Sequence, residues 1–190
     1  MLVLLVLAVL FPSPFQARQA VGAPLDYQDP EAYVVYSMIL PSDWVIRDAH
    51  AKHLVILRET HVYQMCLRPE PEFEQTLGQA IKDYSRINSS AWLSQDKFDS
   101  AFSYELISNE KLTATLGKGN WENFHAYFPE SKGFLEFSAV GFNEDKTIAV
   151  VYMGHSCGLL CGGGGFHVLE KKEGKWLPLH WKGSSCAWVS

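Results

Sequence analysis

The sequence has no cluster of basic side chains, no apolar run of membrane-spanning length and no complete catalytic signature. Its 16 Lys and Arg residues are outnumbered by 21 Asp and Glu residues, which gives a net charge of -5 at pH 7. Without a basic patch there is nothing to hold phosphates, so nucleic acid is not an expected partner. Because a spanning helix needs about 20 apolar residues, we do not expect an integral membrane protein once the N-terminal segment is removed.

Linkers, internal repeats and low-complexity tracts are also absent. Aromatic residues make up 13% of the chain and six of them are tryptophan, which is typical of a folded chain with a filled interior. Residues 23–190 are enough chain to bury a core without help from metals or disulfides. We therefore expect a single domain over residues 23–190.

Residues 1–22 have the pattern of a signal peptide. Leu2 to Phe11 form an unbroken apolar run, Pro12 and Pro14 follow it, and Ala20-Val21-Gly22 supplies small residues of the kind that signal peptidase reads. The basic residues that usually precede such a run are missing, which leaves open a start further upstream or a short anchor. The pattern predicts a secreted or periplasmic protein.

The first half of the chain predicts helices and the second half predicts strands. Helical signals cover Asp29 to Leu40, Phe73 to Ile87, Asn109 to Leu116 and Trp121 to Phe128, with a strand at His53 to Thr60. Strand signals separated by turn residues cover Phe134 to Phe142, Thr147 to His155, Gly165 to Lys171 and Lys175 to Trp181. This order predicts an α+β fold in which N-terminal helices pack on a C-terminal antiparallel meander.

The four cysteines are an even number in a chain with an export signal. Thiols in oxidising compartments usually pair, so we expect two disulfides among Cys66, Cys157, Cys161 and Cys186. Four cysteines allow three connectivities. Cys157 can bridge Cys161 across the glycine-rich stretch, or either of them can reach Cys186.

A pattern of aromatic, glycine and cysteine residues runs through the last third to half of the chain. Its members are Trp121, Phe124, Tyr127-Phe128-Pro129, Ser131, Gly133, Ser138, Val140-Gly141-Phe142-Asn143, Val150-Val151-Tyr152, Cys157-Gly158, Cys161-Gly162, Leu169, Lys171 and Gly174-Lys175-Trp176. This pattern resembles a group of uncharacterised secreted bacterial proteins. The resemblance implies bacterial export and one compact domain, but no activity and no catalytic residue.

Three short motifs in Val150 to Leu169 fall short of the chemistry they suggest. Gly154 to Gly158 matches the nucleophile elbow around Ser156, but a helix must follow an elbow and here glycines and a strand follow. Gly162, Gly163 and Gly164 belong to a run that can nest an anion or simply make a wide turn. The spacing of the two cysteines suits zinc, although oxidised thiols cannot bind it.

The registers of the predicted strands place three histidines on one sheet face. A two-residue turn at Glu173-Gly174 sets His167 opposite His180, a symmetric glycine loop adds His155, and pairing of Phe142 with Thr147 brings Glu136 to the same face. Three imidazoles and a carboxylate are the groups that a zinc or other transition-metal site needs. The other face is expected to be the core.

Two function classes remain open. The first is a non-catalytic exported module that binds a small molecule or a partner protein through the polar sheet face and Gly162 to Gly164. The second is a metal-dependent hydrolase with His155, His167 and His180 as zinc ligands and Glu136 as general base. Metal content separates the two classes.

Overall fold

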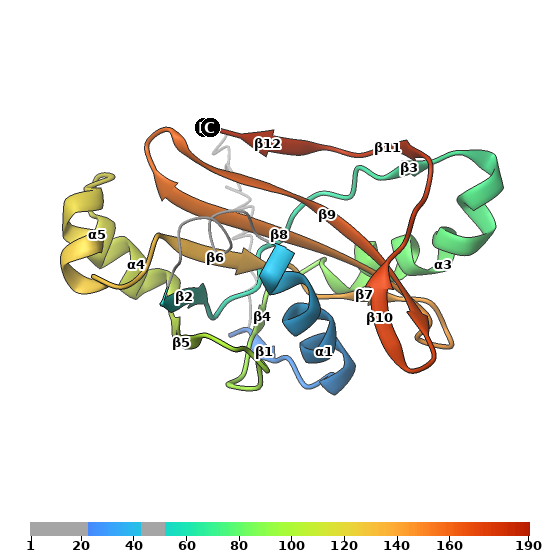
Figure 1. Cartoon of the computed structure of the whole chain (residues 1–190), viewed down its shortest axis with the longest axis horizontal. Helices are drawn as coiled ribbons and strands as arrows, with labels where there is room; N and C mark the ends of the chain where they lie inside the picture. The colour runs from blue at the N-terminus through green and yellow to red at the C-terminus, as the bar shows by residue number, and fades with distance from the viewer. Residues whose placement is uncertain (1–22, 43–51) are drawn as a thin grey trace, which may run out of the picture.

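An eight-stranded sheet forms the centre of the computed structural model, which describes residues 23–42 and 52–190. The segment for which we predict a signal peptide lies outside these residues. The main path runs β10-β9-β8-β6-β2-β5, with β12 beside β9 and β7 beside β8 (Figure 1). The strands are β2 (His53–Leu57), β5 (Ser103–Ile107), β6 (Phe134–Phe137), β7 (Gly141–Phe142), β8 (Ile148–Gly158), β9 (Cys161–Lys172), β10 (Lys175–Pro178) and β12 (Ala187–Val189).

Helices begin where the sequence supplies N-caps. The Asp29 carboxylate accepts a hydrogen bond from the Glu31 N–H, and Pro30 occupies the first turn; Ser108 and Asn120 cap two later helices. The helical elements are α1 (Pro30–Ile39), the 3₁₀ turn η1 (Leu40–Ser42), α3 (Pro71–Ile87), α4 (Asn109–Leu116) and α5 (Trp121–Tyr127). Short strand pairs join β1 (Leu25–Asp26) to β4 (Trp92–Leu93), and β3 (Arg68–Pro69) to β11 (Gly183–Ser184).

The chain contains both helices and strands, as an α+β fold requires, but the sheet is mixed. Strands β6, β8, β9 and β10 pair antiparallel in that order, whereas β2 pairs in parallel with both β5 and β6. The sequence signals predict no strand at residues 103–107, so the parallel part of the sheet is not expected from them. The helices α4 and α5 lie between β5 and β6 in the sequence and provide the long connection that carries the chain from one side of β2 to the other.

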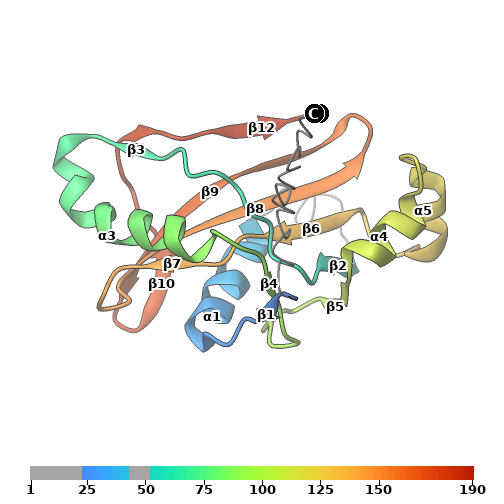
Figure 2. The same cartoon turned by 180° about the vertical axis from the view of Figure 1, so that it is seen from behind.

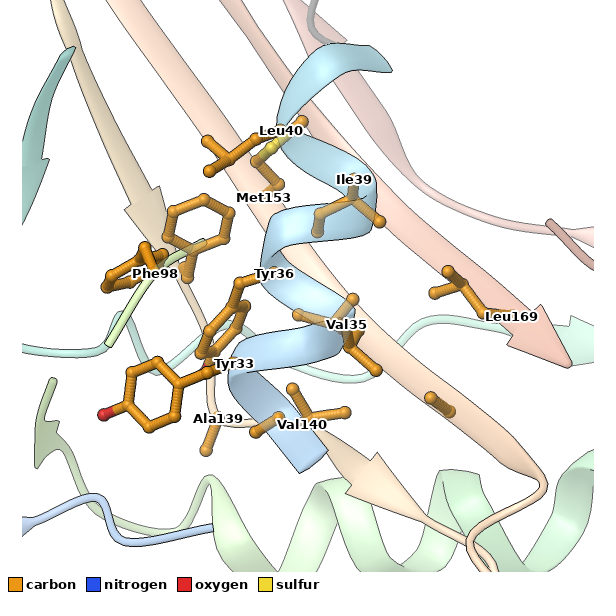
Figure 3. Packing of buried hydrophobic residues seen from close by; sticks show 14 of the residues in the cluster. Tyr33, Val35, Tyr36, Ile39, Leu40, Phe98, Ala139, Val140, Met153 and Leu169 are labelled. Carbon is orange, nitrogen blue, oxygen red and sulfur yellow. The ribbon is translucent and has the colours of Figure 1, made fainter. Parts of the chain in front are cut away.

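Helices cover both faces of the sheet. Helix α1 lies on one face and α3 on the other, as the opposite views in Figures 1 and 2 show. Figure 3 shows the α1 side, where Tyr33, Tyr36 and Ile39 pack with Met153 and Leu169. On the α3 side, Leu77, Ala80 and Tyr84 pack with Ile148, Val150 and Val168. The predicted division into one core face and one polar face is therefore wrong, because the face expected to be polar is buried under α1.

A third apolar cluster lies at the β5 end of the sheet. Val55 and Leu57 of β2 and Phe134 of β6 contact Phe124 and Phe128, which come from α5 and the residue after it. Phe134 and Val150 lie on the same side of the sheet, because Phe134 pairs with Ser156 and side chains alternate along β8. Helices α4–α5 and α3 thus cover different parts of one face.

A β-bulge between β6 and β7 changes the register that the sequence predicts. Phe137 pairs with Met153 and Gly141 with Val150, so residues 138–140 contain one residue more than the facing strand. Buried side chains satisfy the bulged backbone: Tyr36 donates to the Ser138 carbonyl at 2.7 Å, and Tyr152 N–H donates to the Ser138 hydroxyl at 2.8 Å. Glu136 consequently pairs with Gly154 rather than with Met153.

Asn88 holds the same bulge from the end of α3. Its side-chain amide donates to the carbonyls of Tyr84 and Ala139 at 3.0 Å each, and its oxygen accepts the Ala139 N–H at 2.9 Å. Asn88 is 5% exposed. Asn88 therefore has a structural role at the end of α3.

The two hairpins of the meander differ in how well their turns could be predicted. Lys172 pairs with Lys175 as expected, with Glu173 and Gly174 at φ 50° and 78° in the two-residue turn. The β8–β9 connection is instead a tight turn at Leu159 and Leu160, and the glycine run belongs to β9. Within the described ranges, no helix combines the length and apolar character needed to cross a bilayer.

Candidate functional site

An extended segment of residues 59–67 crosses the α3 side of the sheet, between the part covered by α3 and the part covered by α4 and α5. Figure 2 shows this chain between β2 and β3 running over β8. The His61 N–H donates to the Phe137 carbonyl at 2.7 Å, and the Tyr84 hydroxyl donates to the Tyr63 carbonyl at 3.1 Å. These bonds fix the segment to β6 and to α3.

Side chains of this segment alternate between the sheet and the solvent. His61, Tyr63 and Met65 are partly buried and Leu67 is buried, whereas Val62 is 48% exposed. An extended chain points successive side chains to opposite sides. His61 and Tyr63 are therefore directed at the sheet where Glu136 and Tyr152 emerge from it.

Glu136 forms an ion pair with His61. The Nδ1 atom of His61 lies 3.3 Å from Oε2 of Glu136, and the two side chains are 41% and 16% exposed. The hydrogen bond that His61 donates to Glu136, together with the negative charge of that carboxylate, holds the pKa of His61 above the ordinary 6.5, against the opposing effect of burial. The pair thus places a largely buried carboxylate beside a half-exposed, readily protonated imidazole.

Aromatic rings continue from this ion pair along the sheet. The rings of Tyr63 and Tyr152 stack at 4.1 Å with an interplanar angle of 6°, and the His61 ring centroid is 5.9 Å from that of Tyr152. The Trp188 indole N–H of β12 donates to the Tyr152 hydroxyl at 2.6 Å. Burial raises the pKa of Tyr152 to about 12, so its hydroxyl remains protonated at physiological pH. We call Glu136, His61, Tyr63, Tyr152 and Trp188 together the Glu136 site.

Glycines in β8 and β9 make room for this site. A Cβ at Gly164 would lie 2.4 Å from the Tyr152 hydroxyl oxygen and 2.7 Å from the Trp188 Nε1. A Cβ at Gly154 would lie 2.7 Å from the Glu136 Oε1, and one at Gly162 would lie 3.1 Å from the Trp188 ring. The glycines therefore form a floor on which polar and aromatic groups lie close to the sheet backbone.

The structure does not bring the three predicted histidine ligands together. His155 is buried opposite Gly163, and His167 is four residues further along β9, opposite Val151, which separates them by about 13 Å along the strand. His180 is exposed and lies beyond Pro178, the end of β10. Residues 23–42 and 52–190 contain no group of three His, Cys, Asp or Glu side chains placed to hold a metal ion.

Glu136 also differs from its predicted place. The bulge at residues 138–140 shifts β6 by one residue, and a shift of one residue moves a side chain to the other face. Glu136 therefore lies on the α3 side, whereas His155 lies on the α1 side. The general-base role predicted for Glu136 depended on the register that the bulge removes.

The glycine run is not the wide turn that we expected. Residues 163–165 pair with β8 on one edge and with β12 on the other, so their backbone groups serve the sheet. Gly162 and Gly164 thus act through their missing side chains, and Gly163 is paired within the sheet rather than placed in an anion nest. Ser156 lies within β8, and a strand follows it where a nucleophile elbow would need a helix.

All four cysteines form disulfides. Cys66 pairs with Cys186 and Cys157 pairs with Cys161, with Cα atoms 5.9 Å and 5.0 Å apart. The first bond ties the extended segment to the C-terminal chain just before β12, and thereby holds together two of the parts that carry the Glu136 site. The second closes the β8–β9 hairpin next to Leu159 and Leu160.

Three residues of the Glu136 site are not among those that the sequence predicts: His61, Tyr63 and Trp188. The alternation of His61, Tyr63, Met65 and Leu67 directly after a predicted strand was the available signal for the first two. Trp188 had no such signal, because its position in the site depends on the pairing of β12 with the glycine run of β9.

Comparisons with known proteins found no matching family model, no matching curated protein and no matching solved structure. The Glu136 site is therefore interpreted from its own chemistry. Its carboxylate accepts hydrogen bonds, its imidazole donates and accepts them, and the rings of Tyr63 and Trp188 are partly exposed, whereas Tyr152 is buried.

Proposed function

We propose that this protein is an exported, non-catalytic binding module that holds a small hydroxylated molecule, such as a sugar, at the Glu136 site. The observation that carries the proposal is the Glu136–His61 pair set among aromatic rings on a glycine floor. Small-molecule sites commonly combine apolar and aromatic walls with a few fixed polar groups.

The chemistry of a sugar suits these groups. Its hydroxyls donate to a carboxylate and exchange hydrogen bonds with an imidazole, while its C–H faces pack on aromatic rings. Tyr63 and Trp188 are both partly exposed, and Glu136 is held in place by His61, so little side-chain entropy is lost on binding.

Export is supported by two observations and one general principle. The N-terminal sequence has the signal-peptide pattern, both cysteine pairs are at disulfide distance, and disulfides persist mainly in oxidising compartments. The metal-dependent hydrolase is the weaker candidate, because the positions of His155, His167 and His180 give it no supporting geometry.

Saturation-transfer NMR with a panel of neutral mono- and disaccharides tests the proposal. We expect signals from at least one sugar with the wild-type protein, and their loss in Glu136→Gln and Tyr63→Ala. Glu130→Gln, which changes an exposed acid in a loop, is the matched control and should bind like the wild type. Absence of binding by every sugar, or binding that survives both site variants, would show that the proposal is wrong.

A further inference from the structure

A cleft of about 550 Å³ lies between α3, β7, the turn that follows β7 and the residue that caps α1. It shares no residue with the Glu136 site. Ile87, Val140 and Phe142 give it an apolar base, and the aliphatic stems of charged side chains extend that base towards the rim. Its size is in the range of pockets that hold small organic molecules.

Four residues of α3 form a row along the cleft. Gln79, Lys82, Asp83 and Arg86 occupy positions i, i+3, i+4 and i+7, which places them on one helix face. Asp83 is already engaged: Oδ2 accepts the Phe142 N–H at 3.0 Å and Oδ1 accepts Arg86 Nη2 at 2.6 Å. The acid of this row is therefore used by the protein itself.

The cations of the row retain binding capacity. Arg86 bonds to a single oxygen of Asp83 through Nε and Nη2, and its side chain remains 72% exposed. Lys82 lies one turn earlier on the same helix face and has no ion pair with another described residue. Above the apolar base, Lys82 thus presents a positive charge and Arg86 presents N–H donors that Asp83 does not use.

Lys146 lines the cleft on the side opposite α3. Its backbone has a conformation that favours glycine. Its φ is 50°, in the left-handed region, which side chains with a Cβ rarely adopt. Its Nζ lies 2.7 Å from Asp29 Oδ2 and 5.3 Å from the Phe142 ring centroid. A lysine therefore lies beside the cleft at a turn position whose backbone conformation glycine would adopt without strain.

We propose that this cleft binds a small amphipathic carboxylate, with its apolar body against Phe142 and Ile87 and its carboxylate at Lys82 and Arg86. This inference goes beyond the sugar-binding proposal and does not depend on it. Three acids line the cleft and could repel a carboxylate ligand. Two of them are already in ion pairs, Asp29 with Lys146 and Asp83 with Arg86. The third acid, Glu144, lies at the rim.

Calorimetric titration with octanoate tests the proposal, with octylamine as the probe of opposite charge. We expect the wild-type protein to bind octanoate and to bind octylamine at least tenfold more weakly. Lys82→Gln with Arg86→Gln should weaken octanoate binding at least tenfold. Lys118→Gln with Lys175→Gln, two exposed lysines away from the cleft, should leave the binding unchanged.

A second variant separates binding from folding. Lys146→Gly removes the strained side chain, so its Tm should equal or exceed that of the wild type while octanoate affinity falls severalfold. Glu136→Gln should bind octanoate as the wild type does, which keeps this test independent of the sugar site. The proposal is wrong if octanoate does not bind, if octylamine binds equally well, or if the Lys82 and Arg86 double variant retains its affinity.

Discussion

Replacing Glu136 by Gln should change how the stability of the protein depends on pH. Glu136 raises the pKa of His61 above 6.5 in the folded state. A group whose pKa is raised on folding stabilises the native state below its unfolded pKa, and this stabilisation is lost as the pH rises through the folded pKa. The ion pair should therefore stabilise the fold at pH 5.5 and contribute little at pH 8.5.

The magnitude follows from the exposure of the pair. Because 41% of the His61 side chain is accessible to water, screening limits the interaction to about 0.5–1 kcal/mol. Urea unfolding should show that the difference in unfolding free energy between the wild type and Glu136→Gln is larger by this amount at pH 5.5 than at pH 8.5. Glu130→Gln should show no such change.

A direct titration of His61 completes this test. In the wild type its imidazole proton resonances should titrate above pH 6.5, and in Glu136→Gln the midpoint should fall to 6.5 or lower, because only burial then acts on the imidazole. A His61 midpoint that is the same in both proteins would refute the electrostatic reasoning for this site.

The remaining predictions concern stability. Gly164→Ala should destabilise the protein by about 1–3 kcal/mol because the new Cβ collides with Tyr152 and Trp188. Gly165→Ala, whose Cβ would meet Ala187 only at 3.4 Å, should be nearly neutral in the same urea unfolding experiment. Asn88→Ala should cost about 2–4 kcal/mol because it leaves buried backbone groups of the bulge unsatisfied, whereas Ser89→Ala at an exposed position should cost almost nothing. Removing the Cys66–Cys186 bond should cost about 5 kcal/mol and removing Cys157–Cys161 about 2 kcal/mol, since loop-closure entropy grows with the enclosed chain; equal losses in calorimetry would contradict that model.

Local signals in the sequence predicted the helices well. Asp29-Pro30 marked the start of α1, and the apolar period from Phe73 to Ile87 matched most of α3. The Glu173-Gly174 turn also gave the register of β9 and β10. Each of these signals acts within one element or one turn, so a sequence without its tertiary context is enough to find it.

Longer-range features could not be predicted in this way. The bulge at Ser138 to Val140 depends on Tyr27, Tyr36 and Asn88, which lie 51 to 113 residues from their bonding partners and bond to the backbone of the bulge. The glycine run looked like a turn because nothing local indicates that Tyr152 and Trp188 require its missing side chains. The candidate metal site was built on three registers, and the shift at the bulge alone moved Glu136 to the other face.

The central claim is that ligands bind at the Glu136 site, and a map of backbone and indole resonances tests it most directly. With a sugar that binds, ¹H–¹⁵N spectra should show shifts at the Trp188 indole N–H and at the amides of Gly154 and Gly164, and these shifts should disappear in Glu136→Gln. Shifts confined to other parts of the chain, or shifts that persist unchanged in Glu136→Gln, would contradict the claim.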